Sequence, residues 1–412
     1  MRRTVRVGNR LATLAIALLR VVDVSKAALR GQRRSVRDLR RGVGLRVGRA
    51  GGRLLAAILE LALPDRRDEP LWALEGVKRI LVVRPNFRLG NALISAPRVL
   101  ALRKRFPCAQ VDYLTGDRTV DALANLPIDR VYGVSRGDLL RPWRAIALFR
   151  RLRVNRYDLA VVGTAGSLSG CLYAYLTGAR HRLGHRGKGD RLLTVRIPSL
   201  GSSHAYDGAV AFARELGVSC PDRPVYSVGK SERETALALL ARLRLVGDDG
   251  VAPFVSLLIG GHAEKRWDVA SWVSLARGLC AAGVPAVVLL GPEERHLTAL
   301  LMGALPASAR IVSPQRLPVF AALLGLSSVA VTTDSGPMHL AAALGTPTIA
   351  ILRWDLSLRY APRGASDRSF MRPHVQQVIA SVLEHTALAR GGVKPAPIAE
   401  IDRGAAPAAA SA

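Results

Sequence analysis

The run of residues 329–352 constrains the fold more than any other part of the chain. It begins and ends with β-branched and apolar residues that are typical of buried parallel strands. Between these strands, Asp334 and Ser335 are suited to cap a short helix and Gly345 to end it. The first N–H groups of such a helix are open donors with a partial positive charge, and Gly336 lets a ligand approach the backbone closely. The run therefore predicts a phosphate site, although an ordinary strand–helix–strand unit would have the same pattern.

Short apolar strands alternate with amphipathic helices in two stretches of the chain. The first stretch opens with a strand at 79–84, a turn-rich loop and a helix at 92–105, and the second opens with a strand at 254–259. Strand, loop, helix and strand in this order open a doubly wound parallel sheet. We therefore expect two α/β domains, residues 77–228 and residues 229–388.

Three turns in the second stretch follow apolar strands and are expected to meet at the carboxyl edge of its sheet. Two of them are rich in glycine, and two cations and one acidic group lie nearby in sequence. Such groups together predict a nucleotide diphosphate site, although each charged residue alone is equally consistent with a solvated side chain. The residues are Gly260, Gly261, Lys265, Arg266, Gly291, Glu293, Asp334, Ser335 and Gly336.

Motifs that the sequence lacks narrow the chemistry further. No GxGxxG follows the first strand, which argues against the dinucleotide site of dehydrogenases. No Asp-x-Asp occurs, so we expect neither a metal nor a cofactor, and we expect cations and amides to stabilise a leaving diphosphate. The four cysteines are far apart and indicate neither a zinc site nor a disulfide framework, which favours a reducing cytosol.

The chain is strongly basic, with a formal net charge of +29. Residues 1–70 alone contain 17 Lys or Arg and 6 Asp or Glu, which gives +11. The apolar run at 11–19 is too short to span a bilayer, which needs about 20 residues. We interpret 1–76 as a basic helical extension that lies on an anionic inner membrane leaflet, or alternatively as a solvated extension. The Ala- and Pro-rich tail at 389–412 is expected to be disordered.

A second basic stretch, residues 178–191, is rich in glycine and predicts a flexible loop. Its Arg182 and Arg186, with Arg88 in the loop after the first strand, would suit an anionic acceptor, and a solvated loop would explain them equally well. Nucleic acid is not expected as a partner, because no aromatic platform or recognition motif accompanies the charge.

These stretches resemble glycosyltransferase family 9, the ADP-heptose:lipopolysaccharide heptosyltransferases, from about residue 78 to residue 352. The resemblance implies a GT-B fold, in which two Rossmann-like domains face each other across a cleft. It implies an inverting, metal-independent transfer of a sugar, heptose from ADP-heptose, to a lipopolysaccharide core or a related lipid-linked envelope glycan. It also implies a cytoplasmic protein, peripheral on the inner membrane. The segments that carry the resemblance are 79–97, 178–184, 260–267 and 334–347.

The resemblance also implies roles for individual residues. The lysine of the family that corresponds to Lys265 contacts the diphosphate, and the acidic residue that corresponds to Glu293 binds the nucleoside. The turn of Asp334, Ser335, Gly336 and His339 cradles the nucleotide sugar. We therefore expect catalytic positions at Lys265, Asp334 and Asn91, donor contacts at Gly260, Gly261, Arg266, Glu293, Ser335, Gly336 and His339, and acceptor contacts at Arg88, Gly90, Arg182 and Arg186.

One position departs from the family pattern. After Gly90 the family usually has an aspartate that is proposed as general base, and this chain has Asn91, whose amide cannot accept the proton of a hydroxyl group. Asp117, His262 or Glu264 could serve as the base instead. The reaction could also need little base help because stabilisation of the leaving group dominates, which we favour. The third alternative is a weakened transferase that acts as a nucleotide-sugar-binding scaffold in envelope assembly.

Overall fold

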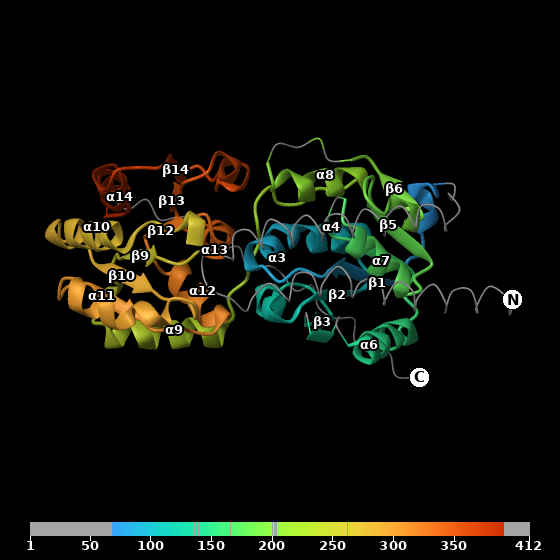
Figure 1. The fold of residues 1–412 in the computed structure, drawn as a ribbon, viewed down its shortest axis with the longest axis horizontal. Helices are drawn as coiled ribbons and strands as arrows, with labels where there is room; N and C mark the ends of the chain where they lie inside the picture. Colours follow the sequence, from blue (N-terminus) through green and yellow to red (C-terminus); the bar gives the residue numbers. More distant parts are fainter. Residues whose placement is uncertain are drawn as a thin grey trace, which may run out of the picture.

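The computed structural model describes residues 68–390, except 136, 139, 140, 165, 200, 202, 203 and 262. The expected basic extension and tail therefore lie outside the described residues, apart from 68–76 and 389–390. The described chain forms two α/β halves that lie side by side, each with a six-stranded sheet (Figure 1).

The first sheet has the strand order β3-β2-β1-β4-β5-β6, and all neighbouring strands are parallel. This is the order of a doubly wound sheet. Helices cover both faces, which is why β1 is a continuous apolar run rather than an alternation of apolar and polar residues. The strands are β1 (Arg79–Arg84), β2 (Gln110–Gly116), β3 (Arg130–Val134), β4 (Leu159–Val162), β5 (His181–His185) and β6 (Val195–Ile197).

The second sheet repeats this topology with the order β11-β10-β9-β12-β13-β14, again with parallel neighbours. Its central strands β9 and β12 are buried along their whole length. The strands are β9 (Val255–Leu258), β10 (Ala286–Leu289), β11 (Arg310–Val312), β12 (Val329–Thr333), β13 (Thr348–Leu352) and β14 (Arg368–Met371), and β7 (Val246–Gly247) and β8 (Gly250–Val251) form a separate hairpin.

The helices form layers on both faces of each sheet. In the first half they are η2 (Leu71–Leu74), α3 (Leu89–Ser95), α4 (Pro97–Arg105), η3 (Asp117–Leu123), α6 (Pro142–Val154), α7 (Leu168–Leu176), η4 (Asp190–Leu192) and α8 (Asp207–Glu215). In the second half they are α9 (Lys230–Arg242), η5 (Ala263–Lys265), α10 (Val269–Ala281), η6 (Arg295–Leu297), α11 (Thr298–Ala304), α12 (Leu317–Gly325), α13 (Gly336–Leu344), η7 (Asp355–Tyr360) and α14 (Val375–Arg390).

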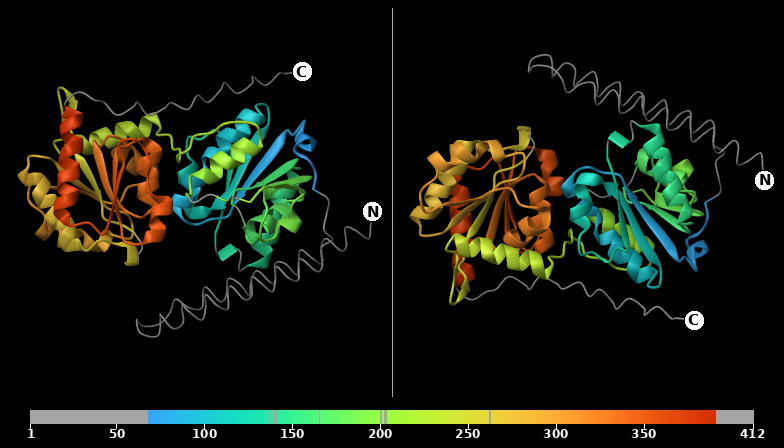
Figure 2. Two further views of the ribbon diagram at one scale, coloured as in Figure 1. Left: turned by 90° about the horizontal axis from the view of Figure 1, so that it is seen from above. Right: turned by 90° about the horizontal axis from the view of Figure 1, so that it is seen from below.

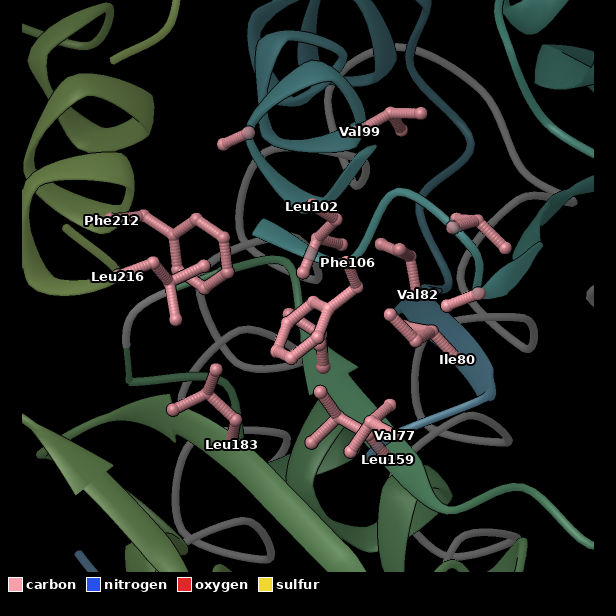
Figure 3. Close-up of a cluster of buried hydrophobic side chains, with 14 of the residues drawn as sticks. Val77, Ile80, Val82, Val99, Leu102, Phe106, Leu159, Leu183, Phe212 and Leu216 are labelled. Atoms are coloured by element: carbon pink, nitrogen blue, oxygen red, sulfur yellow. The ribbon is translucent and has the colours of Figure 1, made fainter. Parts of the chain in front are cut away.

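Successive residues of β1 face different cores. Ile80 and Val82 pack with α4 and α8 in one buried cluster, part of which is shown in Figure 3. Leu81 and Val83 pack with α6 and α7 in another cluster on the opposite face. Because side chains alternate along a strand, the last residue of β1, Arg84, lies on the same face as Ile80 and Val82.

Three sequence expectations about the first half are wrong. The helix expected at 92–105 is two helices, because Pro97 has no N–H to continue α3 and instead begins α4. Helix α3 begins at Leu89, so Gly90 and Asn91 lie in its first turn and not in a loop. The stretch 178–191 is not one flexible loop, because it contains the buried strand β5, which pairs with β4 and β6.

The two halves meet at the helices α3 and α13 (Figures 1 and 2). Ala92 and Leu93 of α3 belong to the same buried apolar cluster as Leu340 and Leu344 of α13. A second contact joins the start of α8 to the segment after η7, where Arg363 pairs with Asp207 at 2.7 Å. The apolar cluster fixes the start of α3 against the start of α13.

Candidate functional site

The start of α13 matches the expectation from the sequence. Strand β12 ends at Thr333, Ser335 is the N-cap residue, and Gly345 ends the helix with a φ of 73°. The Ser335 side chain makes no capping hydrogen bond, and among the described residues no acceptor is found for the amides of Ser335 and Gly336. These open N–H groups, with the helix dipole, form an electropositive opening of the kind that binds phosphate.

The glycine loop after β9 lies directly beside this opening. The hydroxyl group of Thr333 donates to the carbonyl oxygen of Gly260 at 2.7 Å. A Cβ atom added at Gly261, whose φ is 137°, would lie 2.9 Å from Thr333 Oγ1 and 3.6 Å from Ser335 Cβ. A side chain at Gly261 would therefore be strained and would crowd the turn, so glycine keeps the space between loop and turn open.

Lys265 and Asp334 are joined by an ion pair. The carboxylate of Asp334 is buried and also accepts a hydrogen bond from the Ser357 hydroxyl group, while the Lys265 side chain remains 35% exposed. Asp334 therefore holds the ammonium group beside the start of α13, and the exposed part of Lys265 can face a ligand. No feature of the sequence indicated Ser357.

Arg266 braces the glycine loop, and its partner is not the acidic residue expected from the sequence. Its Nε donates to the Gly261 carbonyl oxygen at 2.7 Å, and its NH2 lies 3.2 Å from Glu294 Oε1. Glu294 is buried against Gly260 and Gly291, and burial raises the pKa of its carboxyl group, whereas Glu293 is exposed. The structure thus places Glu294, not Glu293, beside the loop. The sequence alone does not indicate which of the two adjacent glutamates faces the loop, because both follow the same turn.

His339 lies at the contact between the two halves. Its Nδ1 is 2.9 Å from the Tyr206 hydroxyl oxygen, and burial lowers the pKa of the imidazole to about 4, so it is neutral at neutral pH. A Cβ atom added at Gly90 would overlap the His339 ring and lie 3.2 Å from its Nε2. A Cβ atom at Gly336 would lie 2.9 Å from Leu89 Cβ. Both glycines are therefore required by the close approach of α3 and α13.

Asn91 follows Gly90 and is partly buried in the first turn of α3. Its main-chain carbonyl accepts a hydrogen bond from the Ser95 hydroxyl group at 3.0 Å. Arg88, the residue before α3, is exposed, and its amide donates to Asn86 Oδ1 at 2.9 Å. The start of α3 contacts the start of α13 through Leu89 and Gly90, and the expected residues Arg88 and Asn91 are adjacent to these two in the chain.

The expectation for Arg182 is corrected by its surroundings. Arg182 lies in β5, is 8% exposed, and donates to the carbonyl oxygens of Leu192 at 2.6 Å and Ala179 at 2.9 Å. Its charge therefore serves the fold and is not displayed on a loop. Arg186 is exposed, and its guanidinium group forms an ion pair with Asp68.

The other candidate bases have different positions. Asp117 begins η3, and its carboxylate accepts from the Arg118 amide at 2.8 Å. Glu264 is exposed, and its carbonyl oxygen accepts from Trp354 Nε1 at 3.3 Å. His262 lies outside the described residues. In the part of the chain that the structure describes, no helix is long and apolar enough to cross a bilayer, and no three His, Cys, Asp or Glu are grouped as metal ligands.

Comparisons with known proteins give a family match and similar proteins of known name. Residues 145–383 match glycosyltransferase family 9 (heptosyltransferase). The lipopolysaccharide heptosyltransferase 3 of Escherichia coli is 24% identical over 311 residues, which cover 70% of this chain and 85% of that protein.

Two solved structures share the fold. The E. coli ADP-heptose lps heptosyltransferase II aligns with a TM-score of 0.62 and 20% identity, over 76% of this chain and 99% of that one. A glycosyltransferase family 9 protein from Veillonella parvula aligns with a TM-score of 0.67 and 18% identity, over 76% and 97%. The two doubly wound halves therefore form the expected GT-B fold.

Proposed function

Because this chain belongs to glycosyltransferase family 9, the heptosyltransferases, we propose that it transfers a heptosyl group from ADP-heptose to a lipopolysaccharide core acceptor. Two of the similar proteins named above are lipopolysaccharide heptosyltransferases, and one of these two is named for ADP-heptose. The observation that carries the proposal is the shared position of Lys265, the glycine loop and the start of α13. In this proposal residues 229–388 bind the donor and residues 77–228 bind the acceptor.

The donor would bind with its diphosphate at the start of α13. The amides of Ser335 and Gly336 would donate to phosphate oxygens, and the Lys265 ammonium group would neutralise part of their charge. Glu294, beside the loop, is better placed than Glu293 to accept from the nucleoside. His339 is neutral and buried, so it would support the helix start by shape and hydrogen bonding rather than by charge.

The reaction is proposed to invert the anomeric carbon without a metal. The oxygen of an acceptor hydroxyl group forms a bond to the anomeric carbon while the bond from that carbon to the diphosphate oxygen breaks. The electron pair of the broken bond remains on the leaving diphosphate, where Lys265 and the helix amides stabilise it. The hydroxyl proton is lost to water late in the step, because Asn91 cannot accept it and an oxocarbenium-like centre needs only a weak nucleophile.

Two measurements test this function. A thermal-shift panel of ADP-, UDP- and GDP-linked sugars should give its largest rise in melting temperature with the ADP-linked sugar, because a ligand that binds the native state stabilises it. Consumption of ADP-heptose should then depend on a lipid-linked core acceptor. Donor binding without any turnover would instead support a nucleotide-sugar-binding scaffold. This is the alternative function, because the amide of Asn91 cannot act as a general base.

Location at the cytoplasmic face of the inner membrane remains a proposal. It rests on the basic character of residues 1–70 and on the lipid-linked nature of the proposed acceptor. The full chain should sediment with anionic vesicles, and a protein that lacks residues 1–67 should not. This result would support location at the membrane. Equal sedimentation of both proteins would contradict it.

A further inference from the structure

Three buried polar atoms in the first half have no hydrogen-bond partner within the described chain. They are Arg84 Nε, Arg98 Nε and His185 Nε2. Buried polar groups are nearly always hydrogen-bonded, and an unpaired buried charge is costly. Three such atoms in one half therefore call for an explanation.

The three residues occupy one layer of the molecule. Arg84 and His185 are the last residues of β1 and β5, and Arg98 lies in the first turn of α4. Arg84 continues the row of Ile80 and Val82, which face α4 and α8. All three thus lie at the carboxyl edge of the first sheet, under the same two helices.

Contacts to shared neighbours confirm this placement. The Arg98 guanidinium carbon is 5.9 Å from the centre of the Phe212 ring, and the His185 ring is 6.4 Å from the same ring. Burial lowers the pKa of Arg98 to about 10, and the nearby positive charge of Arg84 contributes. Arginine side chains keep their proton in proteins, so both guanidinium groups are cationic at neutral pH.

The charges in this cluster are not balanced. In the part of the chain that the structure describes, no Asp or Glu forms an ion pair or hydrogen bond with Arg84 or Arg98. Glu215 acts electrostatically on His185, and the neutral Tyr113, which acts on both arginines, is hydrogen-bonded to Ser95 at 3.0 Å. Arg98 is 4% exposed while Arg84 is only partly buried, so the pair extends from the interior towards the surface.

The outer end of the pair is directed towards the proposed donor site. Tyr360 of η7 acts electrostatically on Arg84, and the Tyr360 ring lies 6.3 Å from the ring of His339 at the start of α13. Gly163 flanks Arg84 on the other side, where a Cβ atom would lie 3.2 Å from Arg84 Cδ. A group held by the two arginines would therefore belong to a molecule that lies beside the donor.

We propose that Arg84 and Arg98 bind one oxyanion of the acceptor, a phosphate or a carboxylate. His185 is not a ligand of the anion, because its Nδ1 donates to the Pro198 carbonyl oxygen at 2.7 Å and the Nε2 of its neutral ring is therefore an acceptor. The identification of the ligand as the acceptor rests on the proposed function, whereas the oxyanion site itself does not. Two guanidinium groups can give several charge-assisted hydrogen bonds to one oxyanion, and binding would neutralise charges that have no acidic partner among the described residues.

The site is tested by binding, without any need for turnover. With ADP at saturation to occupy the donor site, inorganic phosphate should raise the melting temperature of the wild type. Arg98→Met should weaken phosphate binding about 10-fold or more, since it removes a charge-assisted contact. Without phosphate, this variant should melt no lower than the wild type, because it removes an uncompensated buried charge. Arg84→Gln provides a second variant should Arg98→Met not fold.

Arg182→Met is the matched control, because Arg182 is also buried but its guanidinium group is hydrogen-bonded to carbonyl oxygens. It should lower the melting temperature and leave the response to phosphate unchanged. An unchanged phosphate response in Arg98→Met, or no response in the wild type, would overturn the oxyanion site. ADP affinity reduced 10-fold by Arg98→Met would assign the anion to the donor and overturn the assignment to the acceptor.

Kinetics separate this inference from the proposed function. If the chain transfers heptose, Arg98→Met should raise the KM for the acceptor about 10-fold while kcat and the KM for the donor stay within about threefold. The salt dependence of the acceptor KM should become weaker than in the wild type. A lower kcat with unchanged acceptor KM would contradict acceptor binding. Absence of any transfer would instead contradict the proposed function. In that case the phosphate-binding measurement alone would test the oxyanion site.

Discussion

The two halves have the same strand order, but they differ in whether the cations near the carboxyl edge of the sheet have acidic partners. In the second half, Lys265 pairs with Asp334 and Arg266 pairs with Glu294. In the first half, Arg84 and Arg98 have no acidic partner within the described residues. The paired cations are held in fixed positions before a ligand arrives, which suits stabilisation of a leaving group. The unpaired cations gain a counter-charge only from outside the fold, which suits recognition of an anionic acceptor.

The largest effect is expected from removing the paired cation of the second half. Lys265→Ala should lower kcat about 100- to 1,000-fold, because a preorganised cation is lost where negative charge develops. Lys230→Ala, on the exposed surface of α9, is the control and should stay near the wild type. Initial rates of ADP-heptose consumption measure both. A loss in kcat smaller than about threefold for Lys265→Ala would show that Lys265, paired with Asp334, does not stabilise the leaving group.

The second prediction concerns the neutral histidine at the start of α13. The pKa of His339 is lowered to about 4, against 6.5 for an ordinary histidine. Between these values the unfolded chain binds more protons, so the free energy of unfolding should fall as pH decreases from about 6.5 to about 4, by about 3 kcal/mol. The buried His185 and the partly buried His204, whose pKa values are also lowered, act in the same direction.

His339→Gln should flatten this pH dependence, and the exposed His374→Gln is the control. Urea unfolding at a series of pH values measures the slope. An equally steep slope in His339→Gln would show that the histidine is not held neutral by burial.

The third prediction concerns the close contact between α3 and α13, where the two halves meet. Gly90→Ala should lower the free energy of unfolding by about 1 to 3 kcal/mol, because its Cβ atom would overlap His339 and force α3 away from α13. Gly303→Ala in α11, where a Cβ atom meets nothing within 4 Å, should be neutral or stabilising. Urea unfolding compares the two variants, and equal stability would mean that the close contact is not required.

The smallest effect is expected at the position that departs from the family. Asn91→Asp should change kcat less than about 10-fold, because departure of the diphosphate dominates the barrier. Asn155→Asp, on the far side of the first sheet near Tyr132, controls for a new carboxylate in this half. A gain in kcat of about 100-fold for Asn91→Asp would show that the wild-type enzyme lacks a base that it needs.

Strong local patterns were enough to predict much of the second half. The buried apolar strands, the N-cap at Ser335 and the left-handed Gly345 follow from residues that are adjacent in the chain, and the structure confirms these elements. The short edge strands β3, β6 and β14 were not predicted, because edge strands have less apolar surface to bury and give a weaker periodic signal.

The contacts that complete the site could not be predicted, because they join residues far apart in sequence. Ser357 and Tyr206 reach Asp334 and His339 only through the folded chain. Arg84 was assigned to a strand, and nothing in its neighbours along the chain shows that Arg98 lies beside it. A partial signal existed for Arg84, since a cation at the end of an apolar strand lies at the sheet edge where ligands bind.

A crystal structure of the protein with ADP-heptose or a non-reactive analogue would test the central claim most directly. The account predicts that the diphosphate lies within hydrogen-bond distance of Lys265 Nζ and of the amides of Ser335 and Gly336. A diphosphate bound instead at the edge of the first sheet, beside Arg84 and Arg98, would contradict it.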